Sequence, residues 1–220
     1  MTPRKKKPDD AKLKAEILEA ALKHVVFDGF TDKVLAGAAK ETGADKTAVS
    51  RLFPDGPLSL VEAFSQSADD KMIARLERMD LKTMKVRGRI TAAVKARIDA
   101  LRPHKEAARR AAAFLTLPPH VVLGTKLVYR TVDAMWRAVG DTSTDFNFYT
   151  KRGILAGVYS ATLMRWFTDT SGDDSATEQF LADRIENAMQ FEAFKARAKE
   201  VFDRLPPLSE ILSGLGTRRS

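Results

Sequence analysis

The sequence predicts an all-α fold of about nine or ten helices. Apolar residues recur every three or four positions along almost the whole chain, which is typical of amphipathic helices. No segment combines apolar alternation with the turn signals of a strand series. The 220 residues are 44% hydrophobic and 30% charged, which is typical of a globular protein with a sizeable core.

Three helices are expected in the first third of the chain. The apolar residues of 17–25 share one helix face, and Gly29 ends this helix because glycine readily adopts the left-handed cap conformation. A short second helix is expected over residues 35–42. Asp45 can cap the N-terminus of a third, over residues 46–52.

The rest of the chain predicts a helical body. After the breakers at 53–57, a long helix over 58–79 has inward residues Leu60, Val61, Phe64, Met72 and Leu76. The next helix, over 86–101, is amphipathic through Ile90, Ala93, Val94, Arg97 and Ile98. Further helices are expected over 106–117, 121–139, 176–205 and from a cap at Thr144 or Asp145 to Phe167. The helix ending at Phe167 is apolar on several sides, so we expect it near the centre.

The basic charge lies mostly at the two ends. The net charge is +8, yet residues 8–217 hold 31 basic and 29 acidic residues. The folded body is therefore nearly neutral, which weakens a nucleic-acid interpretation. The absence of cysteine excludes disulfides, thiolate metal sites and cysteine nucleophiles. No apolar run approaches the length of a membrane span.

The residues that carry catalysis in helical proteins are not grouped. His24, His104 and His120 lie far apart in sequence, and no Glu-x-x-His pair of a helical di-iron site occurs. Gly214-Leu215-Gly216 lacks the remainder of a dinucleotide fingerprint. We therefore expect no enzymatic activity, no cofactor and no bound metal.

The first third resembles the helix-turn-helix head of tetracycline-repressor-like regulators, in which the third helix enters the DNA major groove. These regulators usually carry an aromatic residue and a histidine or tyrosine where this chain has Ser50, Arg51 and Leu52. Only Lys46 and Arg51 could reach phosphates, and Asp45 would repel them. We expect residues 10–56 to be a head that does not bind nucleic acid.

Most of the chain, roughly residues 14–215, resembles the ubiquinone (coenzyme Q) biosynthesis protein nine family. The resemblance is most specific in the run from Gly140 to Arg152, GDTSTDFNFYTKR. Other matching segments, in chain order, are PDGPL at 54–58, AAV at 92–94, LRPHKEA at 101–107, LTLPP at 115–119 and LAGVY at 155–159.

The family resemblance implies a tetracycline-repressor-like fold that binds an isoprenoid, quinone or phospholipid ligand. It also implies a homodimer, peripheral to a membrane, that supports the di-iron hydroxylase acting on demethoxyubiquinone. Eukaryotic members carry a transit peptide, but here Asp9 and Asp10 fall in the short segment before the first helix. We therefore expect a bacterial homologue, cytoplasmic and peripheral to the inner membrane.

A lipid pocket is expected in the body, residues 57–204. The helix ending at Phe167 mixes small residues such as Gly153 and Gly157 with bulky ones, which can leave a cleft or allow close helix packing. The resemblance favours the cleft. Its expected lining is Phe114, Leu117, Leu127, Val128, Trp136, Leu155, Tyr159 and Leu163.

A partner surface is expected at the start of the same helix. Its residues are Asp145, Asn147, Phe148, Tyr149, Lys151 and Arg152. They cannot all face the core, so at least some of the three residues Phe148, Tyr149 and Arg152 should be exposed. The resemblance implies that this segment binds the hydroxylase, although most members have tryptophan where this chain has Phe148, whose ring lacks the indole N–H donor. Packing of these aromatics against a dimer mate is the alternative.

The segment 205–220 has the pattern of an interfacial membrane helix. Its apolar residues Leu208, Ile211, Leu212 and Leu215 fall on one face, and Arg218 and Arg219 follow them. Burying four such side chains supplies roughly 6–12 kcal/mol, and ordering the backbone costs about 10 kcal/mol. Attraction of the arginines to an anionic membrane surface can then decide binding. Alternatively, the stripe covers the protein's own core or a neighbour's groove.

Two other functions stay open at this point. One is a DNA-binding regulator whose ligand occupies the same pocket. The other is a structural adaptor without a ligand.

Overall fold

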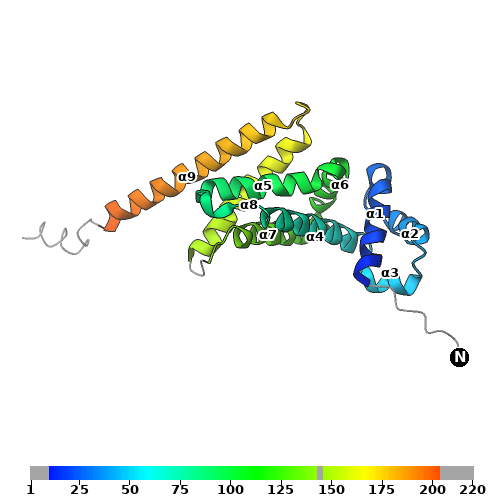
Figure 1. Cartoon of the computed structure of the whole chain (residues 1–220). Helices are drawn as coiled ribbons and strands as arrows, with labels where there is room; N and C mark the ends of the chain where they lie inside the picture. Colours follow the sequence, from blue (N-terminus) through cyan, green and yellow to red (C-terminus); the bar gives the residue numbers. More distant parts are fainter. Residues whose placement is uncertain (1–9, 143–145, 204–220) are drawn as a thin grey trace, which may run out of the picture. The chain divides into compact units, whose positions relative to one another are not determined.

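The computed structural model describes residues 10–142 and 146–203, and over these ranges it is helical without a strand (Figure 1). The α-helices are α1 (Asp10–Asp28), α2 (Asp32–Glu41), α3 (Lys46–Leu52), α4 (Pro57–Leu76), α5 (Val86–Leu101), α6 (Lys105–Leu115), α7 (Val121–Ala138), α8 (Phe146–Phe167) and α9 (Ser175–Asp203). Short 3-10 segments are η1 (Leu81–Thr83), η2 (Arg102–His104) and η3 (Pro118–His120). The all-α prediction is confirmed, and the nine described α-helices match the expected number.

The chain divides into two compact units, residues 1–181 and 182–220, so that α9 crosses the boundary. Most of the described structure, from α1 to the first turns of α9, belongs to the first unit. The boundaries expected at residues 56 and 204 remain predictions.

Local sequence signals set the helices of the head, α1–α3. The Asp45 carboxylate accepts a hydrogen bond from the Ala48 N–H at 2.7 Å, as the cap prediction requires. Gly29 has a φ of +71°, the left-handed conformation expected after α1. The apolar face of α1 is buried, including the residues Ile17, Leu18, Ala21, Leu22 and Val25.

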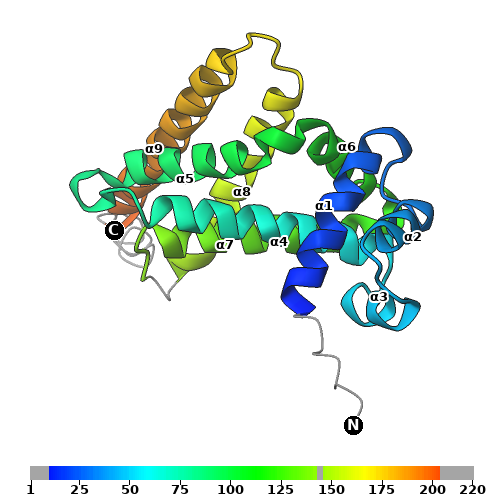
Figure 2. The ribbon, with the colours of Figure 1, turned by 45° about the vertical axis from the view of Figure 1, so that its right-hand side comes forward.

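The body is built on two helix pairs. Helix α4 lies alongside α5, and α7 packs against both α4 and α8 (Figures 1 and 2). The inward residues predicted for the long helix, from Leu60 to Leu76, are all buried. The helix itself ends three residues earlier than expected, because the Glu77, Arg78 and Met79 N–H groups close turns at its end.

Helix α8 buries one face and exposes another. Leu155, Tyr159 and Trp166 are buried, whereas Met164 is 50% exposed. A Cβ added at Gly153 or Gly157 would meet nothing within 4 Å. These two exposed glycines therefore do not allow a close helix approach, and α8 is less central than its composition predicts.

None of the described helices is both long and apolar enough to span a membrane, although the bent pair Val86–Leu115 and Pro118–Ala138 passes the length and composition test together.

Candidate functional site

A buried polar cluster joins α4, α5 and α7. Arg97, on the otherwise apolar face of α5, is 3% exposed, and its Nε lies 2.9 Å from Oδ1 of Asp69 on α4. Thr131 of α7 donates its hydroxyl to the same carboxylate at 2.9 Å. Burial raises the pKa of Asp69, while the charge of Arg97 and the hydrogen bond from Thr131 oppose that rise.

One edge of the Arg97 guanidinium has no acceptor. Its Nη2 donates to the carbonyl and the hydroxyl oxygen of Ser65 at 3.3 and 3.2 Å. Its Nε is ion-paired with Asp69 without a well-aligned hydrogen bond, and its Nη1, which is also fully buried, forms neither an ion pair nor a hydrogen bond within the described residues. Because a buried charged donor without an acceptor is strongly disfavoured, this atom requires a water or a ligand oxygen.

The charges of Arg97 and Asp69 both affect the pKa of Tyr159 on α8. The side chain is 3% exposed, and burial raises the pKa of its hydroxyl. The positive charge of Arg97 lowers that pKa, and the negative charge of Asp69 raises it. The buried Tyr159 hydroxyl on α8 is therefore within electrostatic range of the cluster formed by α4, α5 and α7.

An open cleft of about 470 Å³ lies between α4 and α7, and Asp69 is one of its lining residues. Its lining residues are Gln66, Asp69, Ile73, Arg130, Asp133, Ala134, Arg137 and Ala138. Five of these eight residues are polar or charged, whereas the eight residues of the predicted lipid pocket are all apolar or aromatic. Arg130 is held at one rim by the Gln66 side-chain oxygen, 2.5 Å away.

The eight residues predicted to line a lipid pocket are only partly brought together. Leu127 of α7 and Leu155 and Tyr159 of α8 are buried in the α7–α8 region, and Val128, Trp136 and Leu163 are half-buried. Phe114 stacks on the His120 ring, with centroids 4.1 Å apart. Leu117 is 48% exposed, so it lies at the surface of the molecule. The described residues form the cleft between α4 and α7 and a small one beside Arg102 and Asp174. None of the eight predicted residues is in the lining of either cleft.

The predicted partner surface is split between buried and exposed groups. The Arg152 side chain is 2% exposed, because its Nε pairs with Asp133 at 2.7 Å and its Nη1 with Asp141 at 3.3 Å. Its guanidinium carbon also lies 3.4 Å from the centroid of the Phe148 ring. Tyr149, by contrast, is 67% exposed. Arg152 therefore holds the start of α8 to α7 instead of facing a partner.

Lys151 has a similar structural role. Its Nζ lies 3.1 Å from Oδ1 of Asp141 and 5.5 Å from the centroid of the Trp136 ring. The Trp136 indole N–H donates to the Lys151 carbonyl at 3.3 Å. Asp145 and the side chain of Asn147 lie outside the described residues.

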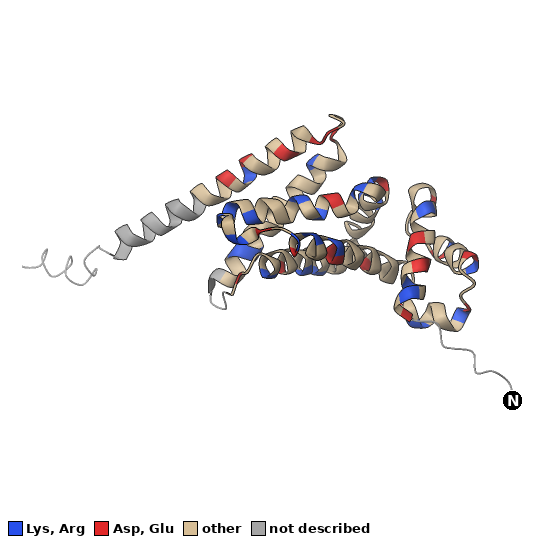
Figure 3. Ribbon diagram, in the orientation of Figure 1, with Lys and Arg blue, Asp and Glu red and all other residues tan. Residues whose placement is uncertain are grey.

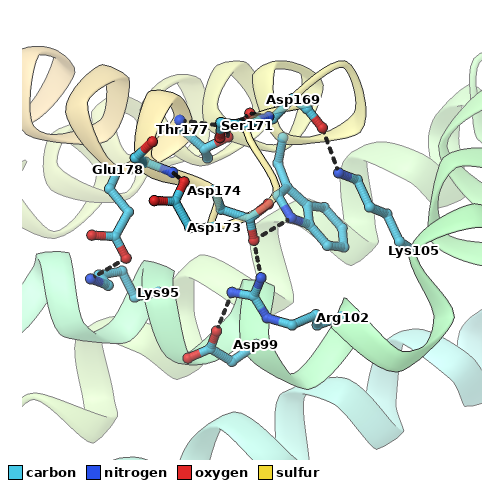
Figure 4. A network of polar contacts seen from close by, with 12 residues as sticks. Lys95, Asp99, Arg102, Lys105, Asp169, Ser171, Asp173, Asp174, Thr177 and Glu178 are labelled. Atoms are coloured by element: carbon cyan, nitrogen blue, oxygen red, sulfur yellow. Dashed lines mark hydrogen bonds and ion pairs between the residues drawn. The ribbon is translucent and has the colours of Figure 1, made fainter.

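The loop from α8 to α9 is tied to η2 and α6 by polar contacts, and Lys95 of α5 pairs with Glu178 at the start of α9 (Figure 4). Asp174 accepts hydrogen bonds from Arg102 and, at 3.1 Å, from the Trp166 indole N–H. Lys105 donates to the Asp169 carbonyl at 3.1 Å. Side-chain hydrogen bonds from Ser171 and Thr177 lower the pKa of the Asp169 carboxyl well below its usual range. The sequence did not reveal this network: it shows a polar loop, but not which distant residues the loop contacts.

Several of the groups considered for DNA binding or metal binding have partners within the chain. Arg51 pairs with Asp10 at 2.6 Å, and Asp45 caps α3. His24 pairs with Glu41, and His104 lies 3.6 Å from Glu19. Among the residues that the structure describes, no three His, Asp or Glu side chains are placed to hold a metal ion. The predicted membrane residues, from Leu208 to Arg219, lie outside the described part of the chain.

Comparison with known proteins gives consistent results. Residues 121–192 match the COQ9 family model. The chain is 32% identical to the mitochondrial ubiquinone biosynthesis protein COQ9 of Bos taurus, over 82% of this chain and 58% of that protein. The corresponding Homo sapiens protein is also 32% identical, with the same coverage. The chain thus spans a little under three fifths of the length of these relatives.

The fold has a clear counterpart among solved structures. A TetR transcriptional regulator from Nitrosomonas europaea superposes with a TM-score of 0.66, over 81% of this chain and 99% of that one. Because the two sequences are only 17% identical, this likeness shows the fold alone. The predicted tetracycline-repressor-like architecture is confirmed.

Proposed function

We propose that this chain, whose residues 121–192 match the COQ9 family model, is a non-enzymatic, lipid-binding accessory protein of ubiquinone biosynthesis. In this proposal it binds an isoprenoid or quinone-type lipid at a membrane and presents it to a di-iron hydroxylase that acts on demethoxyubiquinone. It works as a homodimer, peripheral to the membrane. The names of its relatives support the pathway, and the described structure supports the ligand as follows.

The observation that carries the ligand proposal is the buried Arg97 Nη1 without an acceptor. Because Asp69 already balances the charge of Arg97, the spare N–H suits a neutral oxygen better than a second anion. A ring carbonyl of a quinone-type lipid is such an oxygen. The buried Leu127 of α7 and Leu155 of α8 offer apolar surface for its tail.

Tyr149 supports the presentation step. It is exposed on the first turn of α8, and its ring contacts that of Phe148 edge-on, with centroids 5.1 Å apart. Exposed aromatic residues on a firmly held helix start are typical anchors of protein interfaces. Asp145 and Asn147 belong to the same proposed surface, with Lys151 and Arg152 fixing its backbone.

The segment 205–220 is the proposed membrane contact, through its apolar stripe and terminal arginines. Flotation with anionic vesicles of a chain truncated after Leu205 tests it. We expect the truncated chain to bind less than the full chain, and unchanged binding would contradict this role.

A DNA-binding regulator remains the alternative, because a TetR regulator shares the fold. Salt-dependent binding to duplex DNA distinguishes the two, with Arg51→Ala as the control variant. The pairing of Arg51 with Asp10 leads us to expect only weak binding that this substitution does not change.

The ligand proposal is tested by purifying the full chain under native conditions, extracting it with organic solvent and identifying lipids by mass spectrometry. We expect an isoprenoid or quinone-type lipid in stoichiometric amount. Extracts without any bound lipid would contradict the proposal and favour a structural adaptor.

A further inference from the structure

The hairpin formed by α6, η3 and α7 has an unusual charge composition. Residues 107–132 contain no aspartate or glutamate in a chain that is 30% charged. The same stretch holds four permanent cations, Arg109, Arg110, Lys126 and Arg130 (Figure 3). Glu106 near the start of α6 and Asp133 in α7 lie on either side of this stretch, so an anionic surface would meet no repulsive carboxylate on residues 107–132.

The tip of the hairpin exposes aliphatic side chains. Val122 is 79% exposed, Val121 50% and Leu117 48%. The chain turns tightly here, since the His120 N–H donates to the Leu117 carbonyl at 2.8 Å. The tip is therefore a short apolar projection rather than part of the core.

Packing fixes the direction in which these side chains point. A Cβ added at Gly124 would lie 3.2 Å from atoms of Leu115, so this side of α7 rests directly on α6. Val122 lies two positions earlier, about 200° away around the helix, and so faces away from α6. Tyr129, seven positions after Val122, continues the same outer face and is 43% exposed.

The cations beside the tip keep a positive excess after their ion pairs are counted. Lys126 and Arg130 share a single carboxylate, that of Glu62, at 3.6 and 3.4 Å. Arg109 and Arg110 likewise share Glu106, at 2.8 and 3.0 Å. Each pair of cations thus has one balancing acid.

We propose that the α6–α7 hairpin is a second membrane-contacting element, which inserts Leu117, Val121 and Val122 into the interface of an anionic lipid bilayer. An apolar tip flanked by basic residues, with a tyrosine on the same face, matches the chemistry of the boundary between headgroups and acyl chains. The lysine and arginine side chains stay at the phosphates. This contact is independent of the segment 205–220 and of any ligand within the body.

The absence of cysteine allows a direct test on the full chain. Val122→Cys is labelled with an environment-sensitive dye and mixed with phosphatidylcholine vesicles, with or without phosphatidylglycerol. Phe27→Cys is the matched control, because Phe27 of α1 is also 79% exposed. We expect a blue shift and protection from an aqueous quencher for the label at 122, on the anionic vesicles only. Equal responses at the two positions, or none at 122, would overturn the proposal.

Flotation of unlabelled variants provides a second readout. Val122→Asp should weaken binding to anionic vesicles about tenfold, the equivalent of one aliphatic side chain, while Phe27→Asp leaves it unchanged. Circular dichroism checks that both variants fold. If Val122→Asp binds vesicles normally but changes the oligomeric state in sedimentation, the tip is a protein interface and the proposal is wrong.

Discussion

Arg97 and Arg152 are both buried in the helical body, at 3% and 2% exposure, but their surroundings differ. Arg152 has two carboxylates and an aromatic ring around it, and none of its buried atoms lacks a partner. Arg97 has one carboxylate and one serine, and its Nη1 has no acceptor among the described residues. A satisfied buried cation is a structural element, whereas an unsatisfied one requires something that the chain does not supply.

The largest effect is expected at the satisfied arginine. Arg152→Met leaves Asp133 and Asp141 without their buried partner, so we expect a loss of about 3 kcal/mol in the free energy of unfolding. Urea denaturation measures this. Arg137→Ala is the control, because Arg137 is 69% exposed and pairs with the same Asp133, so its loss should stay below about 1 kcal/mol. Similar losses in the two variants would show that the burial of Arg152 does not determine its contribution to the free energy of unfolding.

Arg97 should respond differently when its partner is also replaced. Arg97→Met alone leaves Asp69 charged and buried, and should destabilise the fold by about 2 kcal/mol. Adding Asp69→Leu removes the unpaired carboxylate, so we expect most of that stability to return in urea denaturation. If the double variant is less stable than the single one, the pair is a net stabilising element and its functional interpretation weakens.

The sequence predicted the features of α3 and α5 that depend on residues close together in the chain. The helix bounds of α3 and α5 agree with the structure, because a cap at Asp45 and a regular apolar face are readable within one segment. Arg97 was recognisable as a charged residue on an apolar face. Its partner Asp69 was not, because the pairing depends on how α4 packs against α5.

The misplacement of Arg152 has the same cause. Its position at the start of an aromatic-rich helix indicated an exposed partner surface. The structure buries it because Asp133 and Asp141, 19 and 11 residues earlier in the chain, converge on its guanidinium. Leu117 was placed in the pocket lining because of the family resemblance, and its exposure was not foreseen because it depends on how the prolines that follow it turn the chain at the surface.

Acid should weaken the loop between α8 and α9, whose Asp169 carboxylate accepts hydrogen bonds from Ser171 and Thr177. The pKa of Asp169 is lowered in the folded state, chiefly by hydrogen bonds from Ser171 and Thr177, so its contribution to stability is present above the ordinary aspartate pKa and is lost as pH falls below it. Asp169→Asn should therefore lower stability at neutral pH and flatten its decrease in acid. Unfolding midpoints measured from pH 7 downward test this, and an unchanged acid profile would contradict it.

The smallest effect on stability is expected at the surface. Tyr149→Ala removes an exposed ring, so the free energy of unfolding should change by less than about 0.5 kcal/mol. Binding to the purified di-iron hydroxylase should nevertheless fall about tenfold or more, as for an interface anchor. Titration calorimetry measures the affinity of the two proteins, with Tyr129→Ala as the control, because Tyr129 is an exposed tyrosine on another helix, α7 (43% exposed). Equal affinities for wild type and Tyr149→Ala would remove this surface from the proposal.

The account depends most on the claim that the spare donor of Arg97 holds the head of a lipid. The direct measurement compares the quinone-type lipid extracted from the wild-type chain with that from the double variant Arg97→Met and Asp69→Leu, purified side by side and quantified by mass spectrometry. We predict that the folded double variant loses most of the bound lipid. An equal amount of lipid in the two proteins would contradict the claim.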